Sequence, residues 1–449
     1  MSRARSSQAC LLFAAFLAAC SMRDGVLGRM RSEGGPDGSG ETSAACMLTS
    51  PSVVIDGHPT CTGRLAAARF ANALCVCNDL ELGGSLTTHG FDSSQWPYQA
   101  GFSEANGAAV GVDGNYLALA GATDVAGSLA IAGSNDLRFA GLLRVRGDFF
   151  AAGNVTAAGS TSVGRHAWLG GSFTGFGPFT VAGSLHHAGT VTALPLLAGT
   201  MQAQAVTVAK SCACSASDLV DVAALVATAR ADNDNARVGV SADALASLAG
   251  EARLTLPCGR IFLSRIAGGG NLTLQVSGQA ALFVGGSIDF RGSLTFDLAP
   301  GAAVDVFVEQ DLLVEGSLGL ASKDRPAAGR IWVGGARAVT LASPWVGNLY
   351  APRARVVIAG GWEAWGAVVA GSLAGGGFAS FYFDRAVLAA GATCSAPRPP
   401  PGVCTRCTWC VGGNACVAGQ CGPCRNDDDC CGLSVCSNGS CVPLVELGE

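Results

Sequence analysis

The stretch "LTFDLAPGAAVDVFVEQDLLVEGSL", residues 294–318, decides the fold that we expect for this chain. Apolar and polar residues alternate over 294–298, and Val304, Val306 and Val308 repeat the pattern with Asp305 and Glu309 on the other face. A period of two places the apolar side chains on one face of a β-strand. The stretch therefore predicts two short strands, each of which buries one face.

A phrase of three residues recurs along the chain: a glycine, a small polar residue, and an apolar residue that opens an alternating run. It occurs at Gly84-Ser85-Leu86, Gly127-Ser128-Leu129, Gly147-Asp148-Phe149, Gly171-Ser172-Phe173, Gly183-Ser184-Leu185, Gly286-Ser287-Ile288, Gly316-Ser317-Leu318 and Gly371-Ser372-Leu373. The copies that start at 127, 147, 171 and 183 are 20, 24 and 12 residues apart. Irregular intervals of this size are typical of solenoid coils with variable turns, which bury their inner faces against one another. We therefore predict a mainly β protein built on a parallel, right-handed β-helix, with a β-sandwich as the alternative.

Two stretches have helical periodicity instead, residues 64–75 and residues 215–235. Ser215 or Ser217 is the expected N-cap of the second helix. Because a solenoid needs its open ends covered, we expect these helices to act as caps on the ends of the β-helix, or to form an insertion over about 212–250.

The composition excludes several classes of protein. Apolar residues make up 49% of the chain, which excludes a disordered protein, and glycine accounts for 63 of 449 residues. The net charge is −5 and the basic residues form no stripe, so we expect no nucleic-acid partner.

The first residues, "MSRARSSQACLLFAAFLAACS", predict export. Arg3 and Arg5 precede an apolar segment over residues 9–18, which is too short for a membrane span of about 20 residues but suits a signal peptide. Leu17-Ala18-Ala19-Cys20 then resembles the lipobox of bacterial lipoproteins. An ordinary secretory signal with an incidental cysteine is the alternative.

The lipobox resemblance implies that Cys20 carries a diacylglycerol and an N-acyl chain such as palmitate. More than one acyl chain gives stable membrane anchoring. Ser21 stands where an Asp would indicate retention in the inner membrane, so we expect anchoring in the outer membrane of the bacterial cell envelope.

Three segments carry a further resemblance: "LPCGRIFLSRIAGGGNLTLQVSGQAALFVGGSI" (256–288), "GNLYAPRARVVIAGGWEAWGAVVAGSL" (347–373) and "FYFDRAVL" (381–388). They resemble an uncharacterised family of exported bacterial β-helix proteins, related to the choice-of-anchor A domains and more distantly to bactofilins. The resemblance covers about residues 60–390, implies an extracytoplasmic β-helix, and leaves the ligand open.

The chain has 20 cysteines, of which Cys10 leaves with the signal peptide and Cys20 is lipidated. The remaining cysteines are disulfide candidates, in the middle at Cys46, Cys61, Cys75, Cys77, Cys212, Cys214, Cys258 and Cys394, and in the tail at Cys404, Cys407, Cys410, Cys416, Cys421, Cys424, Cys430, Cys431, Cys436 and Cys441. Both groups are even in number, as expected if each closes its own disulfides, although their spacing does not reveal the pairing.

In the tail, the C-x-x-C spacings would favour zinc in a cytosolic chain. Export to an oxidising compartment favours disulfides instead, because so short a segment cannot form a core unaided. "CRNDDDCCGLSVCSNGSC", residues 424–441, resembles small Dickkopf-like and knottin-like cysteine-rich modules.

These observations predict five parts along the chain. They are a signal peptide (1–19), a lipidated cysteine with a flexible tether (20–45), a β-helix domain (46–393), a Pro-rich linker (394–403) and a cysteine-rich module (404–449).

The sequence contains no convincing catalytic, cofactor-binding or metal-binding motif. Paired carboxylates of a glycosidase could come from Asp305, Glu309, Asp311 and Glu315, although a solvated strand face gives the same pattern. Rings that could stack on sugars are Trp345, Tyr350, Trp362 and Trp365, for which core packing is the alternative.

We therefore expect a non-enzymatic, membrane-anchored surface lipoprotein with a structural or adhesive role at the cell envelope and no cofactor. Its expected partners are the bilayer, through the acyl chains on Cys20, and envelope proteins or glycans. The alternative is a β-helix protein that binds or cleaves carbohydrate.

Replacing Cys20 with Ala is expected to move the protein from the membrane fraction to the soluble fraction, because the acyl chains have no other attachment point. Fractionation and immunoblotting of cells that express each form measure this. Retention of the Cys20→Ala protein in the membrane fraction would contradict the lipoprotein prediction.

Overall fold

The computed structural model describes residues 50–55, 57–100, 107–341, 344–391, 415–417, 420–426, 429–430, 434–437 and 439–443. Cys20 and the predicted signal peptide, tether and linker lie outside these residues. Within them, no helix is long and apolar enough to cross a membrane.

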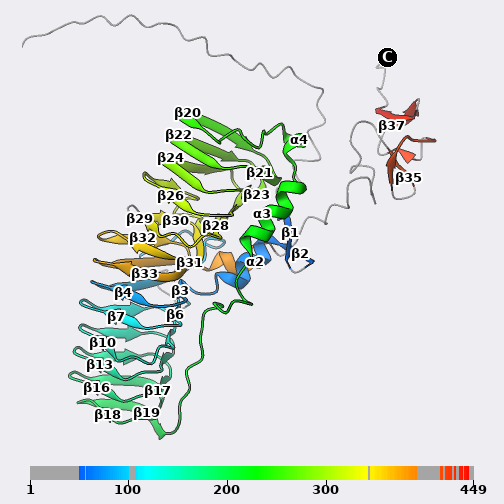
Figure 1. Cartoon of the computed structure of the whole chain (residues 1–449). Helices are drawn as coiled ribbons and strands as arrows, with labels where there is room; N and C mark the ends of the chain where they lie inside the picture. The colour runs from blue at the N-terminus through cyan, green and yellow to red at the C-terminus, as the bar shows by residue number, and fades with distance from the viewer. Residues whose placement is uncertain are drawn as a thin grey trace, which may run out of the picture. The chain divides into compact units, whose positions relative to one another are not determined.

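The central part of the chain is a parallel β-solenoid of about 14 turns, which confirms the prediction of a mainly β, parallel β-helix (Figure 1). Its strands form three parallel faces, here named A, B and C. Long strands bend at a corner and contribute to two faces.

In order along the stack, face A contains β21 (Gly259–Leu263), β23 (Gln279–Val284), β25 (Ala303–Val308), β28 (Gly329–Val333), the first parts of β31 (Asn348–Ile358) and β33 (Val368–Gly375), β3 (Leu74–Val76), β6 (Val110–Val112), β9 (Leu129–Ile131), β12 (Phe149–Ala151), β15 (Ala167–Leu169), and the last parts of β17 (Phe179–His187) and β19 (Leu196–Ala203).

Face B contains the first parts of β20 (Leu248–Leu256), β22 (Ile266–Val276) and β24 (Ile288–Leu298), then β26 (Leu312–Val314), β29 (Val339–Leu341), the last parts of β31 and β33, β4 (Leu80–Leu82), β7 (Tyr116–Ala118), β10 (Leu137–Phe139), β13 (Val155–Ala157), β16 (Phe173–Gly175) and β18 (Val191–Thr192).

Face C contains the last parts of β20, β22 and β24, then β27 (Leu318–Gly319), β30 (Trp345–Val346), β32 (Trp362–Trp365), β34 (Ala379–Asp384), β5 (Leu86–Phe91), β8 (Thr123–Val125), β11 (Leu143–Val145), β14 (Thr161–Val163) and the first parts of β17 and β19.

The order of the coils in space differs from their order in the sequence. The chain enters the stack in the middle, where β3 pairs with β33 on one side and with β6 on the other. A first series of coils runs from β3 to β19. The chain then crosses to β20 at the opposite end of the stack, and a second series returns until β34 pairs with β5 (Figure 1). The first and last coils therefore meet at a joint inside the stack.

The recurring three-residue phrase forms corners of the solenoid. Its apolar residue points inward, so that Phe149, for example, is fully buried. Its polar side chain accepts a hydrogen bond from the backbone of the next coil. Asp148 Oδ1 accepts the N–H of His166 at 3.1 Å, and Ser128 Oγ accepts the N–H of Asp148 at 3.0 Å. A Cβ on Gly147 would lie 2.6 Å from Ser128 Oγ, so the stacking of coils at this corner requires glycine.

Face A is covered on its outer side over the second series of coils. Strands β25 and β28 are buried along their whole length. Helix α3 (Val222–Ala231) lies against β21, β23 and β25. Outward rings on successive strands stack, with 5.6 Å between the ring centres of Phe307 and Trp332, and Phe70 after α2 (Thr62–Arg69) packs on Trp332 at 5.0 Å. The helices thus cover one side of the solenoid as additions to it, and the expectation that they cap its ends is wrong.

The predicted bounds of both helices were also wrong in detail. Helix α2 ends at Arg69, and residues 74–76 form β3 because Leu74 and Val76 point into the core and pair on both sides. Helix α3 begins after Asp221, whose carboxylate accepts the N–H of Ala224 at 3.0 Å, so that Asp221 is the N-cap in place of the two serines.

The remaining elements are short. They are the antiparallel hairpins β1 (Ser52–Ile55) with β2 (His58–Cys61), β35 (Ala415–Val417) with β36 (Gln420–Gly422) and β37 (Ser434–Ser437) with β38 (Ser440–Pro443), helix α4 (Asn235–Val238), and the 3₁₀ turns η1 (Pro326–Ala328) and η2 (Arg385–Ala389).

The direction of side chains in β12 gives a direct test of this coil geometry. Phe149→Ala is expected to lower the free energy of unfolding by about 3–5 kcal/mol, because a fully buried ring is lost. Phe150 is the matched control, since it points outward on the same strand and is only half-buried against Trp168. Urea unfolding followed by circular dichroism should show a clearly smaller loss for Phe150→Ala, and equal losses would contradict the assignment of inward and outward positions.

Candidate functional site

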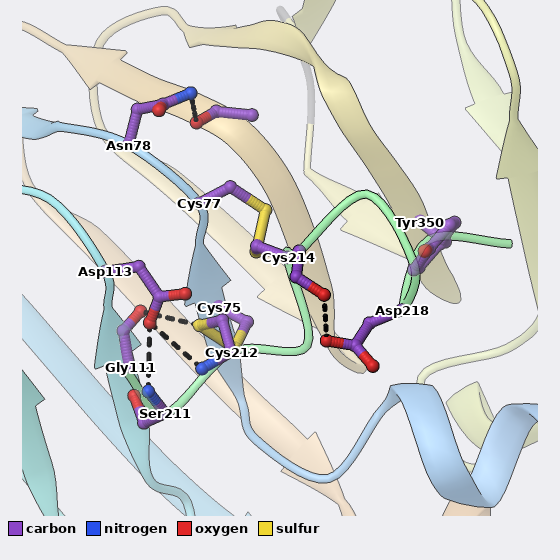
Figure 2. Close-up of a disulfide and its surroundings, with 12 residues drawn as sticks. Cys75, Cys77, Asn78, Gly111, Asp113, Ser211, Cys212, Cys214, Asp218 and Tyr350 are labelled. Carbon is purple, nitrogen blue, oxygen red and sulfur yellow. Dashed lines mark hydrogen bonds between the residues drawn. A yellow bond between two sulfur atoms is a disulfide. The ribbon is translucent and has the colours of Figure 1, made fainter. Parts of the chain in front are cut away.

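A crossing segment, residues 204–247, connects β19 to β20 and is named the strap. Two disulfides, Cys75–Cys212 and Cys77–Cys214, fasten it to strand β3 and the residue that follows (Figure 2). Both bonds join cysteines that are 137 residues apart, so the two segments run in register. The strap is therefore fixed at the joint where the first and last coils meet.

Asp113, which follows β6, orients the strap beside these disulfides. Its Oδ1 accepts the backbone N–H groups of Ser211 at 2.9 Å and of Cys212 at 3.0 Å (Figure 2). The residue is 5% exposed, and its Oδ2 is buried without a hydrogen-bond partner among the described residues. A Cβ on Gly111 would lie 2.9 Å from Cys212 Sγ, so the close approach of the strap requires glycine there.

A second attachment lies at Tyr350, whose phenol oxygen accepts the N–H of Val220 at 3.0 Å. Burial raises the pKa of Tyr350 above its ordinary value and so favours the neutral phenol. Beyond this point α3 buries Val222 and Val226 against face A, and Arg230 forms an ion pair with Glu309 at 2.9 Å. The strap is held along its length by covalent, polar and apolar contacts.

A buried ion pair also lies on the outer side of face A. Arg330 donates to Asp305 through Nε at 2.6 Å and through Nη2 at 2.7 Å, and Trp332 Nε1 donates to the same carboxylate at 3.1 Å. Both charged side chains are less than 5% exposed. Removing one partner of such a pair would leave an uncompensated buried charge, which is strongly destabilising. Asp305 therefore has a structural partner, and the structure does not present it to solvent.

The other carboxylates that the sequence offered for glycosidase chemistry have separate partners. Glu309 pairs with Arg230 at 2.9 Å, Glu315 lies 3.7 Å from Arg291, and Asp311 Oδ1 accepts the N–H of Arg337 at 3.3 Å. The structure does not gather them with Asp305 around one of the grooves found among the described residues.

The four aromatic residues considered for sugar stacking are mostly interior. Trp345, Tyr350 and Trp362 are at most 2% exposed. Trp365 is half-buried, and its ring stacks on Tyr382 at 4.1 Å while Lys323 Nζ lies 4.7 Å from its centre. The hydrogen bond from Lys323 lowers the pKa of Glu363, so this carboxylate remains ionised beside the tryptophan. Packing accounts for these rings.

A groove on face C has polar side chains that could contact a ligand. It has a volume of about 350 Å³ and lies over β22 and β24, next to the loop that contains Ser322 and Arg325. Its lining residues are Thr273, Thr295, Phe296, Asp297, Leu298, Ala321, Ser322, Arg325 and Ala328. Hydroxyl, carboxylate and guanidinium groups therefore line one shallow surface.

The predicted presence of disulfide bonds is confirmed. Besides the pair at the strap, Cys424 bonds to Cys436 in the tail, and Cys61, Cys258 and Cys430 are disulfide-bonded as well. Candidates that lie outside the described residues are Cys46, Cys394, Cys404, Cys407, Cys410 and Cys431.

The fold defines a parallel β-solenoid with a disulfide-fastened strap. Residues 204–389, which span the strap and the second series of coils, match a family described as a domain of unknown function, DUF7305. No curated protein and no solved structure gave a match to the chain. The relation to choice-of-anchor A domains and bactofilins remains a resemblance.

Sequence reasoning missed Asp113 and the pairing of the cysteines. The equal separation of Cys75 from Cys212 and of Cys77 from Cys214 was an available signal, since two segments in register give equal separations. No local signal marks Asp113, because aspartate is common at solenoid corners such as Asp79 and Asp148.

Replacing Cys75 and Cys77 with Ser together is expected to loosen the strap, because the first bond closes a loop of 137 residues and contributes up to about 4–5 kcal/mol, while the second closes only a short further loop and adds less. Limited trypsin digestion should cut after the exposed Lys210 at least tenfold faster than in the wild type. The double variant Cys424→Ser/Cys436→Ser is the control and should leave that rate unchanged. An unchanged rate in the Cys75→Ser/Cys77→Ser variant would contradict the fastening role.

Proposed function

We propose that this chain is a non-enzymatic, membrane-anchored surface lipoprotein with a structural or adhesive role at the cell envelope. The observation that supports it best is the strap fixed by two disulfides across the joint of the solenoid. Disulfides of this kind persist in exported proteins and are rare where thiols are kept reduced.

The construction of the solenoid favours a scaffold. Its faces are continuous parallel sheets, and the joint between the two series is bonded on all three faces by β3–β33, β33–β4 and β34–β5. Covalent attachment of the strap at the same joint resists separation of the two series. A solenoid whose two series of coils resist separation suits a structural or adhesive protein at a cell surface.

A second candidate function, carbohydrate binding, is favoured by the groove on face C. Thr295 and Asp297 alternate outward on β24, and Arg325 borders the same groove. Hydroxyl and carboxylate groups of this kind form the hydrogen bonds that orient a polar ligand such as a glycan. The groove is open, so an extended chain could lie along it.

Binding to isolated envelopes tests both candidates. The lipid-free Cys20→Ala protein is expected to bind saturably to envelope fractions from a strain that lacks the chain, measured by co-sedimentation. If the groove is the contact, soluble envelope glycans will compete and Asp297→Asn will weaken binding about tenfold, whereas the control Thr156→Val on face B will not. Failure to bind any envelope fraction would contradict an adhesive role.

A further inference from the structure

The attachment point of the strap holds several potential metal ligands. A carboxylate oxygen of Asp113 and the sulfur atoms of Cys212 and Cys214 all lie within 4.8 Å of one another. The sulfur atoms of Cys75 and Cys77 are bonded to the two strap sulfurs (Figure 2). The three clustered donors therefore come from the strap and the end of β6, and each strap sulfur is bonded to a cysteine of β3 or of the residue that follows it.

Asp113 is an independent indication that a cation fits here. The side chain is buried, and its Oδ2 makes no hydrogen bond with the described residues although Oδ1 accepts two. Buried polar atoms are nearly always partnered, and a buried carboxylate is costly unless it is hydrogen-bonded, paired or bound to a metal. A cation near the sulfur atoms would give Oδ2 a partner that it lacks in the disulfide form.

We propose that reduction of the two disulfides converts this attachment point into a Zn²⁺ site formed by Asp113, Cys212 and Cys214 together with Cys75 and Cys77. Zn²⁺ takes thiolates at about 2.3 Å and carboxylate oxygens at about 2.0–2.2 Å, usually four ligands in a tetrahedron. Such ligands lie about 3–4 Å from one another, so the three clustered donors need only small shifts, while the two sulfur atoms of each broken disulfide must move apart from bonding distance. Four of the five donors suffice for the ion, and the fifth can remain a thiol.

The chemistry balances with a dithiol as the reductant. Each disulfide takes two electrons and two protons and becomes two thiols, while one dithiol per disulfide is oxidised to its own disulfide. Zn²⁺ then displaces a proton from each thiol that binds it. The ion would bridge the strap to β3 as the disulfides did, so the strap stays fastened in both states.

Alkylation of the full chain tests the proposal cysteine by cysteine, which separates this site from the cysteines of the tail. The protein is reduced with a dithiol, freed of oxidant, and treated with iodoacetamide with and without Zn²⁺, and labelled peptides are quantified by mass spectrometry. Zn²⁺ is expected to slow labelling of Cys212 and Cys214 at least tenfold. Equal labelling with and without Zn²⁺ would overturn the proposal.

Substitution of the carboxylate identifies its role. Asp113→Asn is expected to weaken Zn²⁺ protection of Cys212 and Cys214 by at least the range of about 10–100-fold seen when groups that only support metal ligands are lost, because Asp113 is itself a ligand in this site. Asp148→Asn is the matched control, because Asp148 likewise accepts a backbone N–H of the neighbouring coil, and it should leave protection unchanged. Unchanged protection in Asp113→Asn would remove Asp113 from the site.

A second variant avoids reduction, which could itself disturb the fold. In Cys75→Ser/Cys77→Ser the strap cysteines have lost their bonding partners while the other disulfides can stay oxidised. Once a thiol assay confirms that Cys212 and Cys214 are free, titration with Cd²⁺ is expected to give a thiolate-to-cadmium absorption band that saturates at one ion per chain, because Asp113 and the two thiolates supply three ligands and water can supply the fourth. Absence of the band would overturn the proposal.

Discussion

The pairing of β3 with β33 is the contact on which the rest of the structure depends. It joins residues that lie near opposite ends of the solenoid sequence, Leu74 opposite Val368, and together with the β33–β4 and β34–β5 pairings it keeps the two series of coils from being separate stacks with exposed edges. Contacts of such long sequence separation are costly in chain entropy until they form. The joint is accordingly bonded on every face of the solenoid.

Polar groups reinforce the same joint. The fully buried carboxylate of Asp384, at the end of β34, accepts the N–H of Ser93 at 2.9 Å and the N–H of Ala327 at 3.0 Å. Ser93 belongs to the first series and Ala327 to the second, so one side chain bonds both. The strap disulfides add covalent bonds at β3 and the residue that follows it. Backbone pairing, a buried carboxylate and disulfides thus act together where the chain closes the stack.

The sequence was sufficient to predict the coils but not their order. The glycine-polar-apolar phrase places residues such as Leu129 and Ile288 in the core because a period of two and a corner glycine are local properties. Those properties are the same in every coil, so nothing in the phrase of Gly371-Ser372-Leu373 indicates that its strand pairs with β4. Partners one coil apart, such as Asp305 and Arg330, depend on that order and on the register, and a local pattern contains neither.

The covering of face A explains why some of the candidate contact residues are buried while others are exposed to solvent. Outward positions on β25, β28 and β31 carry Phe307, Trp332 and Tyr350. The sequence alone does not show whether these side chains contact solvent, a sugar or a covering segment. The strap and α2 cover these positions, which turns potential contact residues into core. On face C the outward positions of β24, Thr295 and Asp297, are polar and line an open groove instead. A ligand can therefore reach this region only at the faces that the strap leaves uncovered. In the sequence, polar residues at alternate positions of a strand indicate such an uncovered face.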